Sequence, residues 1–274
     1  MSQFTKILHI GFHKTGTTYL QQYVFPSLAD VTATRGWDPI WSTTNSSPKR
    51  IWLHSDEGLS GSPWGNEQSY KEGFYNRIET ALEYFQPSKI IVTVRPLESW
   101  FESLYKQYLN EGGYLSPKEF CHAEKGVITV DDCLMFPKLV WLSKRVPELL
   151  VLSQNEILLD PKSTIRKIEN FCGTTITSSS KLHSKANVSV KTALQISFLR
   201  RANRLNQRLL IKIHPRLNLY NQRARKFGLS PRQIAQRLLA RIPGSKAEVD
   251  FGHSTQDLVA MKSDWESIKL EFKV

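Results

Sequence analysis

Eight consecutive residues near the amino terminus, GFHKTGTT at 11–18, combine residue types that suit an anionic ligand. A loop between a buried strand and a helix presents unpaired backbone N–H groups and the positive end of the helix dipole. The glycines permit a tight backbone, the lysine adds a positive charge and the threonines add hydroxyl donors. These residues are Gly11, Lys14, Thr15, Gly16, Thr17 and Thr18. They predict a phosphate-binding loop, and a plain strand-to-helix turn with a surface lysine is the alternative.

The position of the lysine separates this loop from the loop of nucleoside-triphosphate hydrolases. Their pattern, G-x-x-x-x-G-K-[ST], has lysine directly after the second glycine, whereas Lys14 comes two residues before Gly16. Such enzymes also present an aspartate at the end of a neighbouring buried strand to hold Mg²⁺. The strongest strand candidate here, IIVTV at 90–94, is followed by Arg95 instead. Arginine suits a second phosphate, and the hydroxyl of Ser103, about two helical turns further on, can join it.

Apolar runs separated by turn residues predict the elements that position these groups. Buried strands are predicted at 6–12, 49–55, 89–95 and 148–153. Helical patterns lie between and after them, and one begins at Asp160 and Pro161 and stops at Gly173. This alternation predicts an α/β fold of the P-loop type, with a central parallel sheet flanked by helices in three layers. Ligands are then expected at the carboxyl ends of the strands.

Composition narrows the class of protein further. With 274 residues, of which 40% are hydrophobic, the chain is long enough for one large α/β domain. Its three cysteines, Cys121, Cys133 and Cys172, lack C-x-x-C spacing, which argues against a disulfide framework or a zinc site. No apolar run has the length of a signal peptide or of a membrane span. We therefore expect a cytoplasmic protein that uses no metal.

The positive net charge of +12 is concentrated in one segment. Residues 170–247 contain 16 Lys or Arg and no Asp or Glu, whereas the rest of the chain has 21 basic residues against 25 acidic ones. Within the segment, helices are predicted near 190–213 and 231–242, followed by a closing helix from about Ser254. Besides a solvated helix face, this charge suits an anionic glycan, the surface of an acidic membrane or nonspecific contact with nucleic acid.

Taken in order, three stretches resemble sulfotransferases that use 3′-phosphoadenosine 5′-phosphosulfate (PAPS). GFHKTGTTYLQ resembles the family's 5′-phosphosulfate loop, and IIVTVRPLESWFESLYKQY resembles its 3′-phosphate strand and helix, with the same arginine-to-serine interval. VLSQNEILLDPKSTIRKIENFCG is similar to a later strand and helix of the family. The resemblance covers residues 5–187 and, more loosely, the last helix. Pro96 directly after Arg95 and Cys172 before Gly173 depart from the family's pattern.

The resemblance implies a role for each residue of the loop and the strand. Lys14 would bind the phosphosulfate near its bridging oxygen, and Thr15 to Thr18, including Gly16, would hold the 5′-phosphate. Arg95 and Ser103 would bind the 3′-phosphate, and Lys185 would contact it or remain a surface lysine. Glu57, just after a predicted strand, is the expected general base for the acceptor hydroxyl. His54 and Asp56 are the alternatives to Glu57.

The expected protein is thus a soluble, bacterial-style PAPS-dependent sulfotransferase of the carbohydrate type. Residues 1–274 are expected to form one domain, with a basic helical insertion at 190–245. The acceptor is expected to be a glycan, a glycolipid or a small alcohol, with peripheral contact to an anionic membrane possible and no specific nucleic acid. Two alternatives remain at this point. One is a P-loop kinase or nucleotide hydrolase, and the other is a non-enzymatic protein that binds anionic polymers or membranes through residues 170–247.

Overall fold

The computed structural model describes residues 4–36, 50–63, 69–122, 127–177, 192–214, 218–220, 226–235, 237 and 249–274. The chain divides into two compact units. Unit 1 comprises residues 1–100, 130–186 and 257–274, and unit 2 comprises residues 101–129 and 187–256. Lys185 lies outside the described residues, so its predicted contact with a phosphate stays a prediction.

Unit 1 is built on a parallel sheet of five strands in the order β2-β3-β1-β4-β5. The strands are β1 (Thr5–Gly11), β2 (Val31–Arg35), β3 (Ile51–Asp56), β4 (Lys89–Val94) and β5 (Glu148–Ser153). Apolar β-branched residues fill the central strands because helices cover both of their faces. The predicted α/β class with a central parallel sheet is confirmed, and so are the four strands expected from the sequence.

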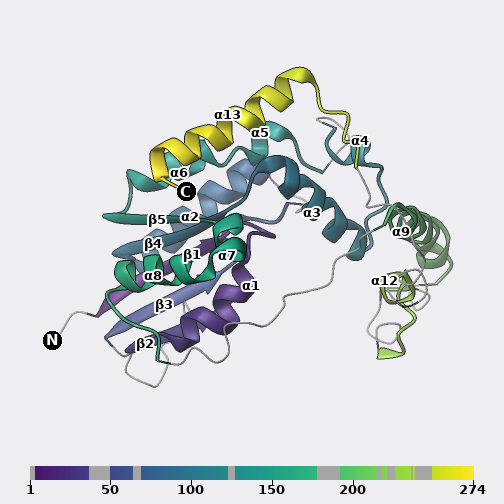
Figure 1. Ribbon diagram of the computed structural model, residues 1–274. Helices are drawn as coiled ribbons and strands as arrows, with labels where there is room; N and C mark the ends of the chain where they lie inside the picture. The colour runs from purple at the N-terminus through teal and green to yellow at the C-terminus, as the bar shows by residue number, and fades with distance from the viewer. Residues whose placement is uncertain are drawn as a thin grey trace. The chain divides into compact units, whose positions relative to one another are not determined.

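Helices cover the two faces of this sheet and complete the three layers of unit 1 (Figure 1). One face carries α1 (Thr17–Tyr19) with its continuation η1 (Leu20–Val24), α7 (Gln154–Leu159) and α8 (Pro161–Cys172). The other carries α2 (Tyr70–Phe85), α6 (Phe136–Ser143) and α13 (Thr255–Phe272). On the first face, Leu20, Phe25, Ile157 and Ile168 share a buried cluster with strand residues such as Ile91.

Local capping explains where several of these helices begin and end. The Asp160 carboxylate accepts from the Ser163 N–H at 3.0 Å, and Gly173 ends α8 with a φ of 67°. Ser116 and Glu119 form a capping box at the start of α4 (Pro117–Phe120). These contacts involve residues a few positions apart, which is why the start and end of α8 could be predicted from the sequence.

Unit 2 contains most of the basic segment. Its described helices are the later part of α3 (Leu97–Asn110), α4, α9 (Ala193–Leu205), η5 (Asn206–Leu210), α10 (Ile211–Ile213) and α12 (Pro231–Ile234). The buried amide of Asn203 donates to the carbonyl oxygens of Leu109 at 2.8 Å and Gly113 at 2.5 Å. The segment 190–245 therefore belongs to a unit that also includes residues 101–129.

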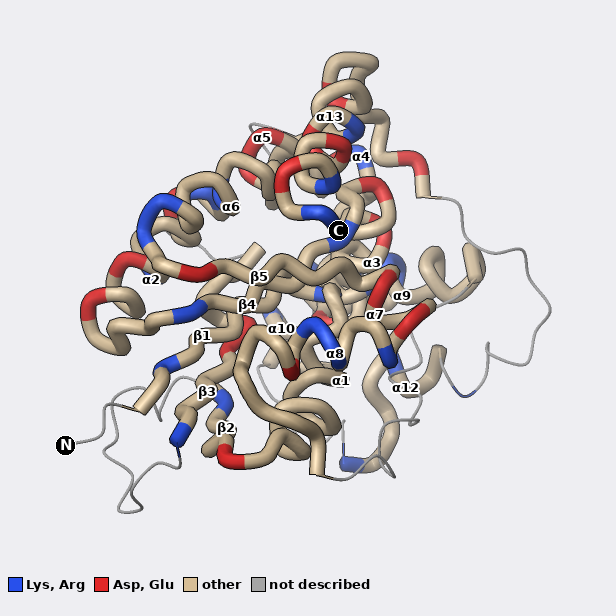
Figure 2. The backbone as a smooth tube through the Cα atoms, turned by 60° about the vertical axis from the view of Figure 1, so that its left-hand side comes forward, with Lys and Arg blue, Asp and Glu red and all other residues tan. Residues whose placement is uncertain are grey.

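Charges of both signs are interspersed along the described helices around the sheet of unit 1 (Figure 2). Two described arginines of unit 2, Arg200 and Arg204, lie close enough to Glu119 to help lower its pKa, although the hydrogen bonds from Ser116 have the larger effect. Within the described part of the chain, no helix is long and apolar enough to cross a membrane.

Candidate functional site

The predicted phosphate loop connects the end of β1 to the helical run that begins at Thr17. Two of its residues adopt left-handed backbone conformations, Lys14 with a φ of 63° and Gly16 with a φ of 97°. These conformations turn the chain sharply, so that Gly16 becomes the residue that precedes α1. The Tyr19 N–H donates to the Gly16 carbonyl at 3.0 Å, whereas the N–H groups before it have no acceptor within the helix. They are therefore available to an anion at the carboxyl end of the sheet.

Gly11 is required by a close approach within the loop. A Cβ atom at this position would lie 1.9 Å from the Thr17 hydroxyl oxygen. Thr17 is buried and β-branched, so its side chain has few alternative rotamers. The Thr17 side chain therefore packs directly against the backbone of Gly11 at the end of β1. A larger residue at position 11 would displace it.

We therefore expect Gly11→Ala to lower the free energy of unfolding by about 1–3 kcal/mol, as overpacking of a filled site does. Urea unfolding of the purified protein measures this value. Gly73→Ala is the matched control, because a Cβ at position 73 in α2 meets nothing within 4 Å. This control should raise stability by about 0.5–1 kcal/mol, since alanine is the better helix former. Equal stability of the two variants would contradict the crowding at Gly11.

The threonines of the loop have different environments. The Thr15 hydroxyl is buried, donates to the Phe12 carbonyl at 2.5 Å and lies 2.7 Å from the Thr93 hydroxyl. These hydrogen bonds connect the loop to β4. Because the Thr15 hydroxyl is engaged in them, only the Thr15 N–H can bind a ligand. The Thr17 hydroxyl oxygen is buried and has no hydrogen-bond partner among the described residues. A buried polar atom without a partner costs about 1–3 kcal/mol. Because Thr17 is 0% exposed, its hydroxyl packs inside the loop and is not presented to a ligand.

Arg95 lies beside the loop in the structure. It follows β4, which pairs with β1, and its Nη1 donates to the Lys14 carbonyl at 3.4 Å. Its Nε donates to the Ser99 hydroxyl at 2.8 Å. The indole N–H of Trp100 donates to the His13 carbonyl at 2.6 Å, so residues 95–100 contact the loop twice.

The hydroxyl that holds Arg95 in this structure is that of Ser99, one helical turn before Ser103. Ser103 lies on α3 within unit 2, and its pairing with Arg95 on one phosphate stays a prediction. Sequence reasoning missed Ser99. The signal was available, because a serine four residues after a strand-end arginine falls in the first turn of the following helix.

The predicted general base lies on the other side of the loop. β3 also pairs with β1, with Asp56 opposite Ile10, so the turn after Asp56 adjoins the start of the loop. His13 Nε2 lies 2.9 Å from the Gly61 carbonyl and links the loop to this turn. Glu57 is half-buried at the start of the turn. The structure thus brings Glu57, Lys14 and Arg95 to the same edge of the sheet.

The two alternatives to Glu57 are less suited to act as the base. His54 is buried, its Nδ1 lies 2.9 Å from the Thr34 hydroxyl, and burial lowers its pKa to about 4. It contacts Phe85 of α2, on the face of the sheet that α2 covers, and this argues against a catalytic role. Asp56 accepts from the Gly58 N–H at 2.7 Å, and burial raises its pKa. Its second carboxylate oxygen is buried without a partner among the described residues.

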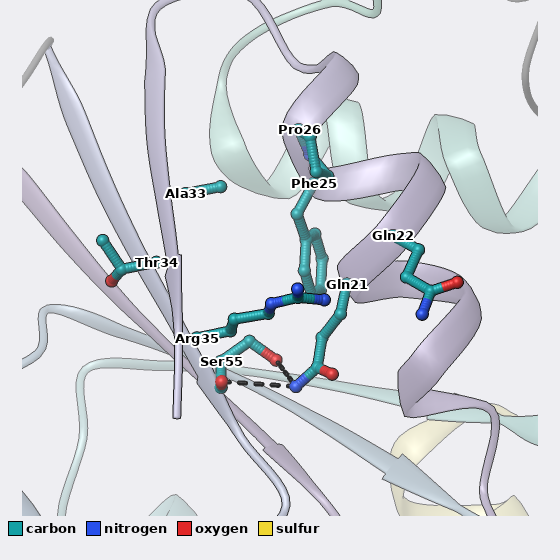
Figure 3. Close-up of a pocket in the computed structure, with 8 residues that line it drawn as sticks. All are labelled: Gln21, Gln22, Phe25, Pro26, Ala33, Thr34, Arg35 and Ser55. Carbon is teal, nitrogen blue, oxygen red and sulfur yellow. Dashed lines mark hydrogen bonds between the residues drawn. The ribbon is translucent and has the colours of Figure 1, made fainter. Parts of the chain in front are cut away.

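A cavity of about 430 Å³ opens on the opposite face of β2 and β3 (Figure 3). Its polar lining includes Gln21 and Gln22 of η1, Arg35 of β2 and Ser55 of β3, and Phe25 contributes an aromatic wall. None of these residues was anticipated, because their meeting depends on β2, which the sequence did not reveal.

Below the cavity, a chain of buried hydrogen bonds fixes Ser55. Its hydroxyl lies 2.6 Å from His9 Nδ1 and accepts from Gln21 Nε2 at 2.9 Å. Burial and, to a smaller extent, the nearby His54 lower the pKa of His9 to about 3, so His9 is neutral at physiological pH. The described residues contain no group of three or more His, Cys, Asp or Glu side chains placed to hold a metal ion.

Comparison with known proteins gives one kind of match. No model of a protein family matches the chain, and no curated protein matches it. Among solved structures, the chain is similar to a sulfotransferase from Alicyclobacillus acidocaldarius, with 13% sequence identity and a TM-score of 0.49. The alignment covers 68% of this chain and 87% of that protein.

Proposed function

We propose that this protein transfers the sulfuryl group of PAPS to a hydroxyl of an acceptor, with a carbohydrate or glycolipid as the expected acceptor class. One observation carries the proposal: Arg95, from the end of β4, donates to the carbonyl of Lys14 inside the phosphate loop. The Arg95 guanidinium therefore lies against the backbone of the loop that carries Lys14, at the carboxyl edge of the sheet. A donor with two separate phosphate groups, such as PAPS, suits these two cationic residues.

Each residue of the loop then has a defined task. The backbone N–H groups of Thr15 to Thr18 and the half-buried Thr18 hydroxyl would bind the 5′-phosphate. Lys14, whose side chain is exposed, would neutralise charge on the oxygen that bridges phosphorus and sulfur. Arg95, with Ser103 as its proposed helper, would bind the 3′-phosphate.

The reaction would be an in-line displacement at sulfur. The acceptor oxygen forms a bond to sulfur while the bond from sulfur to the 5′-phosphate oxygen breaks, and that oxygen keeps the electron pair. The acceptor proton passes to the Glu57 carboxylate, and adenosine 3′,5′-bisphosphate (3′,5′-ADP) leaves. Catalysis of this kind depends on positioning and on stabilising charge on the leaving group.

The structure favours a second candidate, a Mg²⁺-dependent phosphotransferase, through Asp56. β1 has two neighbours in the sheet, and although β4 is followed by Arg95, β3 ends at Asp56. An aspartate at the end of a strand beside a phosphate loop is where such enzymes hold their metal. Burial raises the pKa of Asp56, however, and one of its oxygens is engaged by Gly58. Both the raised pKa, which favours the protonated form, and the bond to Gly58 make Asp56 a weaker metal ligand than an exposed carboxylate.

Nucleotide binding distinguishes the two candidates. We expect 3′,5′-ADP to raise the melting temperature, since a ligand at 100 times its Kd stabilises a protein by about 2.7 kcal/mol. Arg95→Ala should raise the Kd for 3′,5′-ADP by about tenfold or more, because charge-assisted hydrogen bonds to phosphate are lost. Thermal shift and calorimetric titration measure both effects.

Arg166→Ala is the matched control, because Arg166 is exposed on α8, away from the loop. It should leave the Kd for 3′,5′-ADP unchanged. Stabilisation by Mg²⁺ and ATP, without any by 3′,5′-ADP, would replace the sulfotransferase proposal with the phosphotransferase. The basic residues of 190–245 are proposed, separately, to attract an anionic acceptor or membrane surface.

A further inference from the structure

The cavity between η1, β2 and β3 has the chemistry of a binding site for an anion-bearing molecule. Arg35 extends from β2 towards Gln21 and the ring of Phe25, at the wall of the cavity (Figure 3). The lining contains no Asp or Glu, and no described acidic residue pairs with Arg35. The guanidinium therefore brings a positive charge to the cavity that the described side chains do not neutralise.

The polar wall of the cavity is preorganised by buried groups. Ser55 is 1% exposed, and its hydroxyl is held between His9 Nδ1 and Gln21 Nε2. Gln21 Nε2 also donates to the Ser55 carbonyl at 3.3 Å, which fixes the orientation of its amide. With its N–H groups engaged by Ser55, the Gln21 amide presents its oxygen away from Ser55 (Figure 3). An acceptor oxygen for a ligand hydroxyl and a cation for a ligand anion thus lie on neighbouring walls.

Two residues that line the cavity, Gln21 and Ser55, are close in sequence to residues of the proposed catalytic site. Gln21 follows Thr17 by four residues along the helical run, a separation of about one turn, or 5.4 Å. Ser55 precedes Glu57 by two residues, about 6–7 Å along an extended chain. The cavity therefore lies beside the helical run that follows the phosphate loop and beside the strand that precedes the proposed base. The volume of about 430 Å³ falls in the range of ligand pockets, about 300–1,000 Å³.

We propose that this cavity is the acceptor site, and that the acceptor is a small polyhydroxylated molecule that carries an anionic group bound by Arg35. This inference rests on the proposed sulfotransferase function for its catalytic meaning. The anion, a carboxylate or a phosphate on the acceptor, is bound by the guanidinium. The hydroxyl to be sulfated points from the cavity towards Glu57 and the loop. Gln21 and Gln22 supply hydrogen bonds to the remaining hydroxyls.

The test is a set of ligand-observed NMR titrations with glucose, glucuronate and glucose 6-phosphate, carried out without nucleotide. The three probes share a sugar ring and differ in the anionic group, so they separate a carboxylate from a phosphate. We expect one or both anionic sugars to bind at least about tenfold more tightly than glucose, as a charge-assisted hydrogen bond allows. Arg35→Gln should remove this preference, and Arg35→Lys should retain part of it.

Two further variants test the proposal without any change at position 35, so a folding defect of the Arg35 variants would not affect them. Gln22 is exposed on η1, and Gln22→Glu adds a negative charge to the wall, so it should weaken the anionic sugars without weakening glucose. Arg50→Gln is the matched control, because Arg50 is exposed just before β3, at the opposite edge of the sheet. It should leave all three titrations unchanged.

The results separate this inference from the proposed function. If glucose and both anionic sugars bind equally, or not at all, or if Arg35→Gln and Gln22→Glu leave the preference intact, the inference is overturned even where 3′,5′-ADP binds. If the anionic preference depends on Arg35 but 3′,5′-ADP does not bind, the anion site stands and the sulfotransferase function fails.

Discussion

Replacement of Glu57 by glutamine is expected to lower kcat for sulfuryl transfer by about 10²- to 10⁴-fold, the usual contribution of a general base. Glutamine has nearly the same size as glutamate but cannot take the proton from the acceptor hydroxyl. Glu57 lies directly after β3, whose last residue, Asp56, pairs with Ile10 just before the phosphate loop. The Kd for 3′,5′-ADP should not change, because the proposed nucleotide contacts come from the loop and from Arg95. Transfer of labelled sulfate from PAPS and calorimetric titration measure the two quantities.

The matched control is Glu83→Gln, since Glu83 is exposed on α2 and distant in sequence from the loop. Its kcat should equal that of the unaltered protein. Near-normal turnover of Glu57→Gln would remove Glu57 from the mechanism. Asp56, the residue directly before it, would then be the next candidate for the general base. Asp56→Asn would then be the informative variant. Its stability must be measured in parallel, because Asp56 also holds the Gly58 N–H.

The second large effect is expected at Lys14. Lys14→Met should lower kcat/KM by about 10²- to 10³-fold, as the loss of one group that stabilises transition-state charge does. The ammonium group is proposed to neutralise the oxygen that leaves with the 5′-phosphate, and methionine keeps the length of the side chain without its charge. Lys14→Arg should retain more activity than Lys14→Met. Steady-state kinetics with PAPS as the varied substrate provide the measurement.

The backbone at Lys14 allows a control that separates strain from chemistry. Its φ of 63° is a left-handed conformation that costs a residue with a Cβ about 1–2 kcal/mol, whereas glycine adopts it readily. Lys14→Gly should therefore be no less stable than the unaltered protein while it loses as much activity as Lys14→Met. Full activity of Lys14→Gly would show that only the shape of the loop matters, and the proposed role of the ammonium group would be wrong.

Much of the fold of unit 1 could be predicted from the sequence because its signals are local. The run KIIVTV forms β4 as expected, since a strand covered on both faces is apolar along its whole length. Capping residues such as Asp160 act on N–H groups three positions away, so the start of α8 could also be predicted. β2 was missed because it lacks such a local signal. Its sequence, VTATR, lies at the edge of the sheet and buries only Val31, so it lacks an apolar run.

Some residues of the candidate site could be predicted from the sequence, and others were shown only by the structure. The sequence predicted the loop at 11–18, and the structure places Arg95 against it, because both follow strands that are neighbours in the sheet. The sequence also predicted that Ser103 joins Arg95 on one phosphate, which stays a prediction, and it missed Ser99, which accepts from Arg95 Nε. It ranked His54 as an alternative base, and only the packed sheet shows that this side chain is buried against Phe85.

By itself, the sequence determined the residue types of the loop, the cation that follows β4 and the α/β class, because each depends on neighbours along the chain. Strand order and burial were decided by the tertiary structure. The order β2-β3-β1-β4-β5 places Asp56 and Arg95 on opposite sides of the loop strand. It also joins Arg35, Ser55 and Gln21, which are separated by up to 34 residues, around one cavity. Such contacts depend on which strands pair, and hydrophobic periodicity within one segment carries no information about the partner of that segment.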